Sequence, residues 1–188
     1  SDPLIFTIEQ RFNYILQRLM PYLRQSLSKT LVIQKLAEVL GLKVRLMDEL
    51  LTNWVNSPTD PTQKSIAEFL DRNFSESNQR VHLNEATFVD QFSTFKLLHK
   101  ISLIITKFNI TSNQLRWLFG QGYGQSVGWL NPALLPVIAT TPQSFTSWER
   151  LFDLFTLRNE LPDGESTLGN LFDLARKTGT TKSMLLEK

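Results

Sequence analysis

The sequence predicts an all-α fold, a helical bundle built from stacked helix–turn–helix units with no significant β-sheet. Apolar residues recur every three or four positions over most of the chain, which is the period of an α-helix. Proline, glycine and N-capping residues divide the 188 residues into segments of helix length. We therefore expect one all-α domain over residues 1–188, with possible sub-units 1–56, 61–119 and 129–188.

A helix–turn–helix unit occurs twice in the sequence. The first copy spans residues 31–52 and the second spans residues 99–119, with an offset of 68 positions (108 − 40). Under this offset Leu36 corresponds to Ile104, Met47 to Leu115, Leu50 to Leu118 and Leu51 to Phe119. Such units bury little surface alone and stack on neighbours, so the repeat favours a structural role over catalysis. The residues assigned to the turns and their packing are Gly41, Leu36, Leu40, Leu42, Phe108, Asn109 and Ile110.

Local signals place the helices of the first half of the chain. A capping box begins at Thr7, and Pro21 is expected to kink or restart the helix that follows, because proline clashes with the preceding turn. Gly41 suits a left-handed C-terminal cap, and the next helix follows from residue 43. Asp60 as N-cap and Pro61 at the first helical position then predict a further helix.

Similar signals continue to the end of the chain. Asn84 is expected to cap a long helix over 84–105, whose broadly apolar surface makes it central. The glycines of 120–128 predict a flexible loop, and 129–138 is expected to form one short helix or turn between prolines. Thr146 begins a second capping box that opens a helix, and 167–177 is the last full helix.

Composition excludes several classes of function. The 20 Lys and Arg residues against 18 Asp and Glu give a net charge of only +2 without basic clusters, so nucleic acid is a poor default partner. The absence of cysteine excludes disulfides, thiolate metal sites and cysteine nucleophiles. No signal peptide or membrane-spanning apolar run is recognisable. Because residues 178–188 begin another helix and stop, we expect a fragment of a much larger chain.

No group of residues predicts an enzyme, a cofactor site or a metal site. The glycine loop 120–128 lacks the lysine of a P-loop and the preceding strand of a dinucleotide fold. The two histidines, His82 and His99, have no cysteines nearby and no metal-ligand spacing. Six carboxylates that might supply an acid–base pair are assigned to solvated surface, namely Asp48, Glu49, Asp153, Glu160, Asp163 and Glu165.

Two further readings of the sequence stay open. The spacing around Gly41 also fits a DNA-binding helix–turn–helix, in which residues 43–49 would be the recognition helix. That helix offers few groups able to read base edges, and the matching turn at Asn109 favours a packing unit instead. The four tryptophans belong to the core or to exposed interaction surfaces that a neighbour covers in the parent protein, and they are Trp54, Trp117, Trp129 and Trp148.

Several segments resemble one known family. Residues 19–42 read LMPYLRQSLSKTLVIQKLAEVLGL, and they are similar to the helical region of the A subunits of bacterial toxin complexes, the insecticidal Tc toxins. Residues 107–115 (KFNITSNQL) and 148–158 (WERLFDLFTLR) resemble the same region, and so do residues 168–178. The resemblance spreads over most of the chain as a pattern of apolar positions with a few shared words and no catalytic motif.

The resemblance implies a non-enzymatic part of a TcA-like, pore-forming translocation subunit. In that family this region belongs to the α-helical shell around the channel of a secreted pentamer, and the enzymatic activity lies on a different component. The implied partners are other domains of the same large subunit, a homo-pentamer of the full-length parent, and other toxin components or the host surface. Nucleic acid binding and direct membrane insertion by this fragment are not implied, and the parent is expected to be secreted or associated with the cell surface.

Overall fold

The computed structural model describes residues 8–75, 84–120, 128–138 and 144–175, and these contain helices and no strand. The prediction of an all-α fold is confirmed. An isolated antiparallel bridge between Asn56 and Lys64 is too short to count as a strand. The capping box at Thr7, the histidine His82, most of the glycine loop and the segment 178–188 lie outside the described residues.

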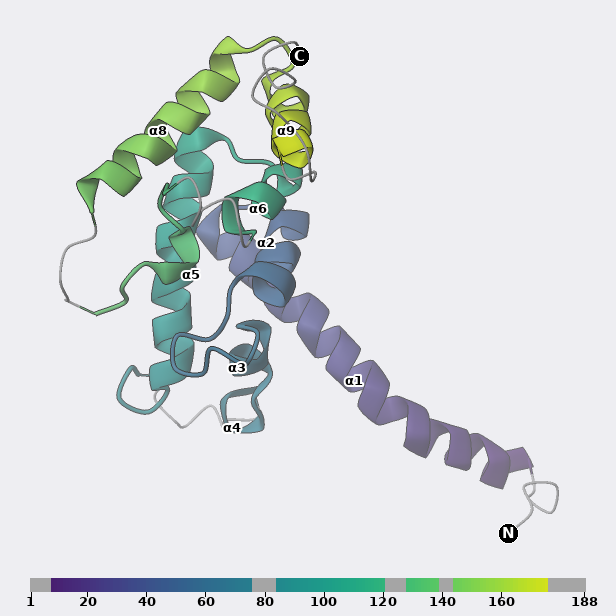
Figure 1. Ribbon diagram of the computed structural model, residues 1–188. Helices are drawn as coiled ribbons and strands as arrows, with labels where there is room; N and C mark the ends of the chain where they lie inside the picture. The colour runs from purple at the N-terminus through teal and green to yellow at the C-terminus, as the bar shows by residue number, and fades with distance from the viewer. Residues whose placement is uncertain (1–7, 76–83, 121–127, 139–143, 176–188) are drawn as a thin grey trace.

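The helices form a body from which the N-terminal part of α1 projects (Figure 1). Helix α1 (Ile8–Leu40) packs into the body with its C-terminal turns and is followed by α2 (Val44–Glu49) and a π-helical turn, η2 (Leu50–Trp54). The remaining elements are α3 (Ile66–Leu70), α4 (Arg72–Ser75), α5 (Val89–Phe108), α6 (Ser112–Phe119), the 3-10 turn η3 (Pro132–Leu134), α8 (Phe145–Glu160) and α9 (Gly164–Ala175).

Helix α5 lies at the centre of the body, as its apolar character predicts. It contacts α1, α3 and η3, while α6 contacts α2 on one side and α9 on the other. One buried apolar cluster extends from Ile33 on α1 to Leu168 on α9. The largest fully buried side chains include Met47, Leu98 and Phe155, which come from three different helices. Because this cluster continues through both helix–turn–helix units and the last two helices, the described helices share one core.

Two predicted helix starts are turns instead. The Oδ1 atom of Asp60 accepts hydrogen bonds from the backbone N–H and the hydroxyl of Thr62, and α3 begins only at Ile66. Asn84 likewise accepts from the backbone N–H of Thr87, several residues before α5 begins. Asp and Asn side chains satisfy nearby N–H groups in turns as readily as at helix ends, so the local pattern was ambiguous.

Three other boundaries also differ from the sequence-based expectation. Of the two expectations for Pro21, the restart is wrong: α1 runs through the proline as one helix, which lacks a single backbone hydrogen bond there, and the kink stays a prediction. Helix α8 begins at Phe145, so Thr146 lies within the helix and is not its cap. Helix α9 begins at Gly164, three residues before the expected start.

Candidate functional site

The two helix–turn–helix units end their first helices with the same backbone geometry. Gly41 (φ 65°) and Asn109 (φ 50°) are both left-handed, as expected for a C-terminal cap. The N–H of Leu42 bonds to the carbonyl of Ala37 (2.9 Å), and the N–H of Ile110 bonds to that of Ile105 (3.0 Å). These are matching Schellman turns at the offset of 68, and the second helices keep that offset because they begin at positions 44 and 112.

The two turns face each other across a shallow groove. Gly41 and Leu42 line one side, and Asn109 and Ile110 line the other, around a volume of about 340 Å³. The corresponding turns of the two units therefore lie next to each other. The second helices of the units, α2 and α6, are also in contact. The predicted packing residues Leu40 and Ile110 are buried, whereas Leu36, Leu42 and Phe108 are partly buried against the core.

A buried polar contact, which the sequence analysis missed, fixes the second unit. Gln114 is 1% exposed, and its side chain closes a capping box with Thr111 at the start of α6. Arg158 on α8 donates hydrogen bonds to Gln114 Oε1 (3.0 Å) and to the carbonyl oxygen of Phe108 (2.7 Å). The signature Thr-x-x-Gln was readable at 111–114. No local pattern predicts Arg158, because its partners are 44 and 50 positions away.

Of the two alternatives for the tryptophans, burial in the core holds for Trp117 and Trp129, and an exposed interaction surface is wrong for them. Both are buried, their ring centroids are 6.4 Å apart, and both pack against Phe172 on α9. Large aromatic side chains bury the most area per residue, which suits the junction of several helices. Trp54 is half-buried and stacks on Phe119, and Trp148 is the one of the four that stays exposed.

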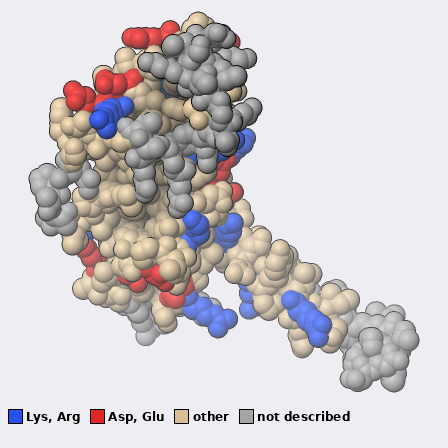
Figure 2. Space-filling view, in the orientation of Figure 1, with Lys and Arg blue, Asp and Glu red and all other residues tan. Residues whose placement is uncertain are grey.

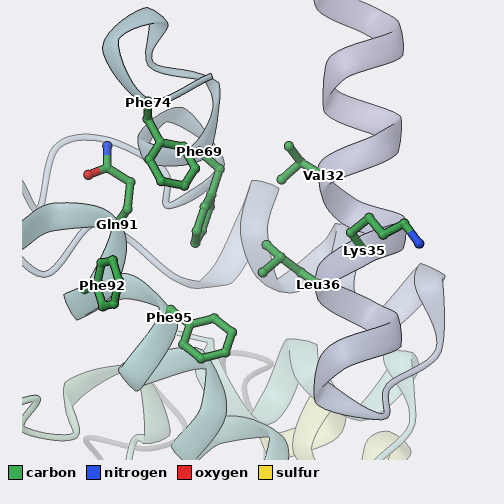
Figure 3. Close-up of a pocket in the computed structure, with 8 residues that line it drawn as sticks. All are labelled: Val32, Lys35, Leu36, Phe69, Phe74, Gln91, Phe92 and Phe95. Atoms are coloured by element: carbon green, nitrogen blue, oxygen red, sulfur yellow. The ribbon is translucent and has the colours of Figure 1, made fainter. Parts of the chain in front are cut away.

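An apolar groove lies beside α1 where that helix meets the body (Figure 3). Val32 and Leu36 of α1 form one wall, and phenylalanines from α3, α4 and α5 face them from the other side. The groove has a volume of about 380 Å³. Its lining residues are Val32, Lys35, Leu36, Phe69, Phe74, Gln91, Phe92 and Phe95. An apolar lining with few polar groups offers packing to a ligand and no reactive group.

The first 24 of the 33 residues of α1, residues 8–31, project from the body, and we call them the arm (Figure 1). Many of its large apolar side chains are exposed, although this class of residue is normally covered. They are Tyr14, Ile15, Leu19, Met20, Tyr22, Leu23, Leu27 and Leu31. An exposed apolar surface of this extent on one helix is typical of a protein or membrane interaction site.

The arm repeats the helix face with which α1 packs on its own body. Ile15 is 18 residues before Ile33 (33 − 15), Leu19 is 18 before Ala37 and Tyr22 is 18 before Leu40. Eighteen residues are five whole helical turns, so the two sets share one face about 27 Å apart. Ile33, Ala37 and Leu40 are buried, whereas their counterparts on the arm are exposed. The arm thus carries the same kind of packing face without a cover.

The charged residues of α1 are all basic from residue 10 to residue 37, which covers most of the arm. From residue 10 to residue 37 the sequence contains no Asp or Glu, and its charged residues are Arg11, Arg18, Arg24, Lys29 and Lys35. In Figure 2 the arm shows blue patches on a tan surface, while the red patches lie on the body. This charge favours partners whose neighbouring groups are acidic or neutral.

The other candidate groups do not assemble into a reactive site. His99 and the carboxylates of Asp153, Glu160 and Asp163 are exposed, and Asp48 and Glu49 are half-buried. Among the described residues, no three metal-ligating side chains gather in one place. No helix in the same ranges has both the length and the apolar character to cross a membrane.

The expected recognition helix of a DNA-binding unit packs into the body. In α2, Leu46 and Met47 are buried, and Arg45 forms an ion pair with Glu49 (3.3 Å). Asp48 lies 3.8 Å from Lys29 of α1, so carboxylates accompany the cations on this surface. Phosphate contacts are made by Lys and Arg, and Lys29 and Arg45 are paired with carboxylates on this surface.

Comparisons with models of known protein families, with curated proteins and with solved structures give no match. The resemblance to Tc toxin A subunits therefore depends on the sequence segments described above.

Proposed function

We propose that this chain is a non-enzymatic structural and interaction module whose body holds the arm in place for docking to other helices. One observation carries the proposal. The arm exposes a second copy of the face that α1 buries in the body, at Ile15, Leu19 and Tyr22. Burial of a helix face contributes about 25 cal/mol of stabilisation for each Å² of apolar surface removed from water. The exposed face of the arm does not gain this stabilisation until a partner covers it.

The direction of this face favours a protein partner over a flat surface. Ile33, Ala37 and Leu40 point into the body, and the arm presents its counterparts on the same side of the helix. A partner on that side therefore lies next to the body, as another layer of helices would. A planar bilayer touching the same face would meet the body, because the body covers Ile33, Ala37 and Leu40 on that side of α1.

The proposal also assigns this chain to a larger protein, a TcA-like translocation subunit. A piece of the helical shell of a TcA-like translocation subunit would dock on other domains of that subunit, or on neighbouring subunits of a pentamer. The support consists of the segments 19–42, 107–115 and 148–158, together with an all-α body that displays an unpaired helix face. Secretion and a role in toxin delivery belong to the same proposal.

Binding of an anionic apolar dye tests the proposed surface. The probe 8-anilinonaphthalene-1-sulfonate combines an apolar ring system with a sulfonate, and so matches the apolar and basic character of the arm. We expect Ile15→Glu with Leu19→Glu, which alter the proposed face, to lower its fluorescence about threefold without changing the unfolding temperature of the body. Val39→Glu is the matched control, because Val39 is exposed on α1 outside the arm. A large drop in unfolding temperature in the arm variant would show that the arm belongs to the fold, and would refute the proposal.

DNA binding is tested with the same protein. The helix–turn–helix alternative requires affinity for duplex DNA that falls steeply with salt and disappears in Lys43→Ala with Arg45→Ala. We expect no such affinity at about 150 mM salt. A salt-dependent complex lost in this double variant would favour the DNA-binding function.

A further inference from the structure

The arm carries an unbroken row of exposed apolar side chains. Ile15, Leu19, Leu23, Leu27 and Leu31 follow one another at intervals of four, and their exposed fractions lie between 40% and 69%. Residues spaced by four form one of the ridges with which helices pack into each other's grooves. The row is not the same as the face that includes Ile33. Ile15 and Leu19 belong to both, but Leu23, Leu27 and Leu31 lie progressively further around the helix, away from the body.

The row is symmetric about its central residue. In an antiparallel pair of arms that cross at Leu23, residue number i of one copy faces residue 46 − i of the other. Ile15 then faces Leu31, Leu19 faces Leu27, and Leu23 faces Leu23. Each step of four turns the row by about 40° around the helix, so Leu19, Leu23 and Leu27 meet their counterparts at the crossing, while Ile15 and Leu31 lie about 80° to either side of Leu23 and flank it.

The charges of the arm are compatible with the same register. Within residues 14–32, Arg18 faces Ser28, Arg24 faces Tyr22 and Lys29 faces Gln17. Within this range no cation therefore faces another cation, and the one like-charge pair of the register, Arg11 with Lys35, lies 12 residues from the crossing point, about 18 Å along the helix. Arg24 can lie over the ring of Tyr22 of the other copy, which is a favourable cation–π pair. A parallel pair places each cation beside its own copy, which is unfavourable.

The body leaves room for this arrangement. Leu27 and Leu31 are the members of the row nearest to the body, and at 69% and 57% they are also its most exposed members. Gln34 and Glu38, which continue that side of α1 into the body, are exposed as well. A second helix crossing at Leu23 therefore meets no covering element among the described residues.

We propose that the occupant of this row is a second copy of the chain, bound through an antiparallel crossing of two arms centred on Leu23. The inference rests on the proposed function, since it names the partner of the same arm. Three of these side chains on each copy lie at the crossing, so the buried area falls below the roughly 1,000 Å² of a stable specific interface and the association is a weak one. A dissociation constant of about 10–100 μM is the corresponding expectation.

Sedimentation of the full chain over a range of concentrations tests the dimer. We expect reversible dimerisation with a midpoint in the stated range, and a monomer at all concentrations for Leu23→Glu, which buries two carboxylates against each other. Val39→Glu should dimerise like the unchanged chain. If the unchanged chain stays monomeric to about ten times the expected constant, or if Leu23→Glu dimerises normally, the inference is overturned.

Cysteine cross-linking tests the register, and the chain offers a clean background because it contains no cysteine. Under mild oxidation Leu23→Cys should form a disulfide-linked dimer. Leu19→Cys alone should not, because the two copies of residue 19 are then eight residues, about 12 Å, apart along the helices. A mixture of Leu19→Cys and Leu27→Cys should link efficiently. Efficient linkage of Leu19→Cys to itself would contradict the antiparallel pair.

The outcomes separate this inference from the proposed function. A monomeric chain whose arm still binds the dye overturns the second copy as occupant and leaves the docking surface in place. Co-sedimentation of the monomeric chain with vesicles of anionic phospholipid, lost in Leu23→Glu, overturns it in favour of a lipid surface. A monomeric chain whose dye binding is independent of the arm removes both proposals.

Discussion

Arg158 on α8 donates a hydrogen bond to the backbone carbonyl of Phe108, the last residue of α5, at a distance of 2.7 Å. Carbonyl groups at the end of a helix lack an intrahelical partner, so a donor from a distant helix satisfies one of them. The same guanidinium donates to Gln114 at the start of α6, and it lies 4.9 Å from the ring centroid of Phe155. One side chain therefore links α8 to the turn of the second helix–turn–helix unit.

Removal of this link should destabilise the body. We expect Arg158→Ala to lower the free energy of unfolding by about 2–3 kcal/mol, because it leaves Gln114 and the Phe108 carbonyl without this donor. Arg158→Lys should recover part of the loss, since an ammonium group lacks the planar fork that reaches both acceptors. Urea unfolding measures the difference. Arg116→Ala is the control: its ion pair with Asp173 is exposed, so a change below about 0.5 kcal/mol is expected.

The two left-handed caps should lose similar stability when replaced by alanine. A Cβ atom built on Gly41 has no neighbour within 4 Å, so Gly41→Ala costs only backbone strain, about 1 kcal/mol. Asn109→Gly should be close to neutral, because glycine adopts the same conformation without strain, while Asn109→Ala should cost about as much as Gly41→Ala. Thermal unfolding checks all three variants. Equal stability of Gly41→Ala and the unchanged chain would contradict the role of the cap.

Equivalent core positions in the two units should be equally sensitive. Met47 and Leu115 correspond under the offset of 68, and both are 0% exposed. Truncation of either one to alanine should lower the free energy of unfolding by about 2–5 kcal/mol, because the surrounding helices cannot fill the cavity. Leu103→Ala serves as the control, since Leu103 is exposed on α5 and should change stability by less than about 0.5 kcal/mol. A cost confined to one unit would show that the two units are not packed alike.

The turn at Asp60 should depend on pH. The hydroxyl and then the backbone N–H of Thr62 donate to its carboxylate, and these bonds lower the pKa of Asp60. A carboxyl whose folded pKa is depressed stabilises the fold above the unfolded value of about 3.9, and this contribution disappears as the pH falls through the folded pKa. We expect Thr62→Ala to raise the pKa of Asp60 towards its usual value, as followed by NMR titration of the carboxyl carbon. An unchanged pKa would assign the shift to another group.

The sequence predicts this fold where short-range physics determines it. The helical period, the left-handed cap at Gly41 and the repeat at Asn109 each depend on residues within one or two turns, so they are readable without the tertiary structure. Asp60 and Asn84 show the limit, because an Asx turn and an N-cap have the same local signature.

The candidate site was less predictable for a physical reason. Apolar periodicity shows that a helix has a packing face, but it does not show whether that face is covered. Ile15 and Ile33 have the same residue type and lie on the same face, yet only Ile33 meets the body. Conversely, Trp117 and Trp129 are buried because α9 supplies Phe172, far along the chain. Coverage is a property of the assembled helices.

Pro21 gives the arm a mechanical property. The proline removes the hydrogen bond that would join its nitrogen to the carbonyl of Gln17, so bending at this point is easier than elsewhere in α1. The first turn of α1 lies 13 residues beyond Pro21 (21 − 8), about 20 Å, so a bend of about 10° there moves the tip by roughly 3–4 Å. The N-terminal end of the arm can therefore move to fit a partner by bending at Pro21, while Ile33 and Ala37 stay packed against the body.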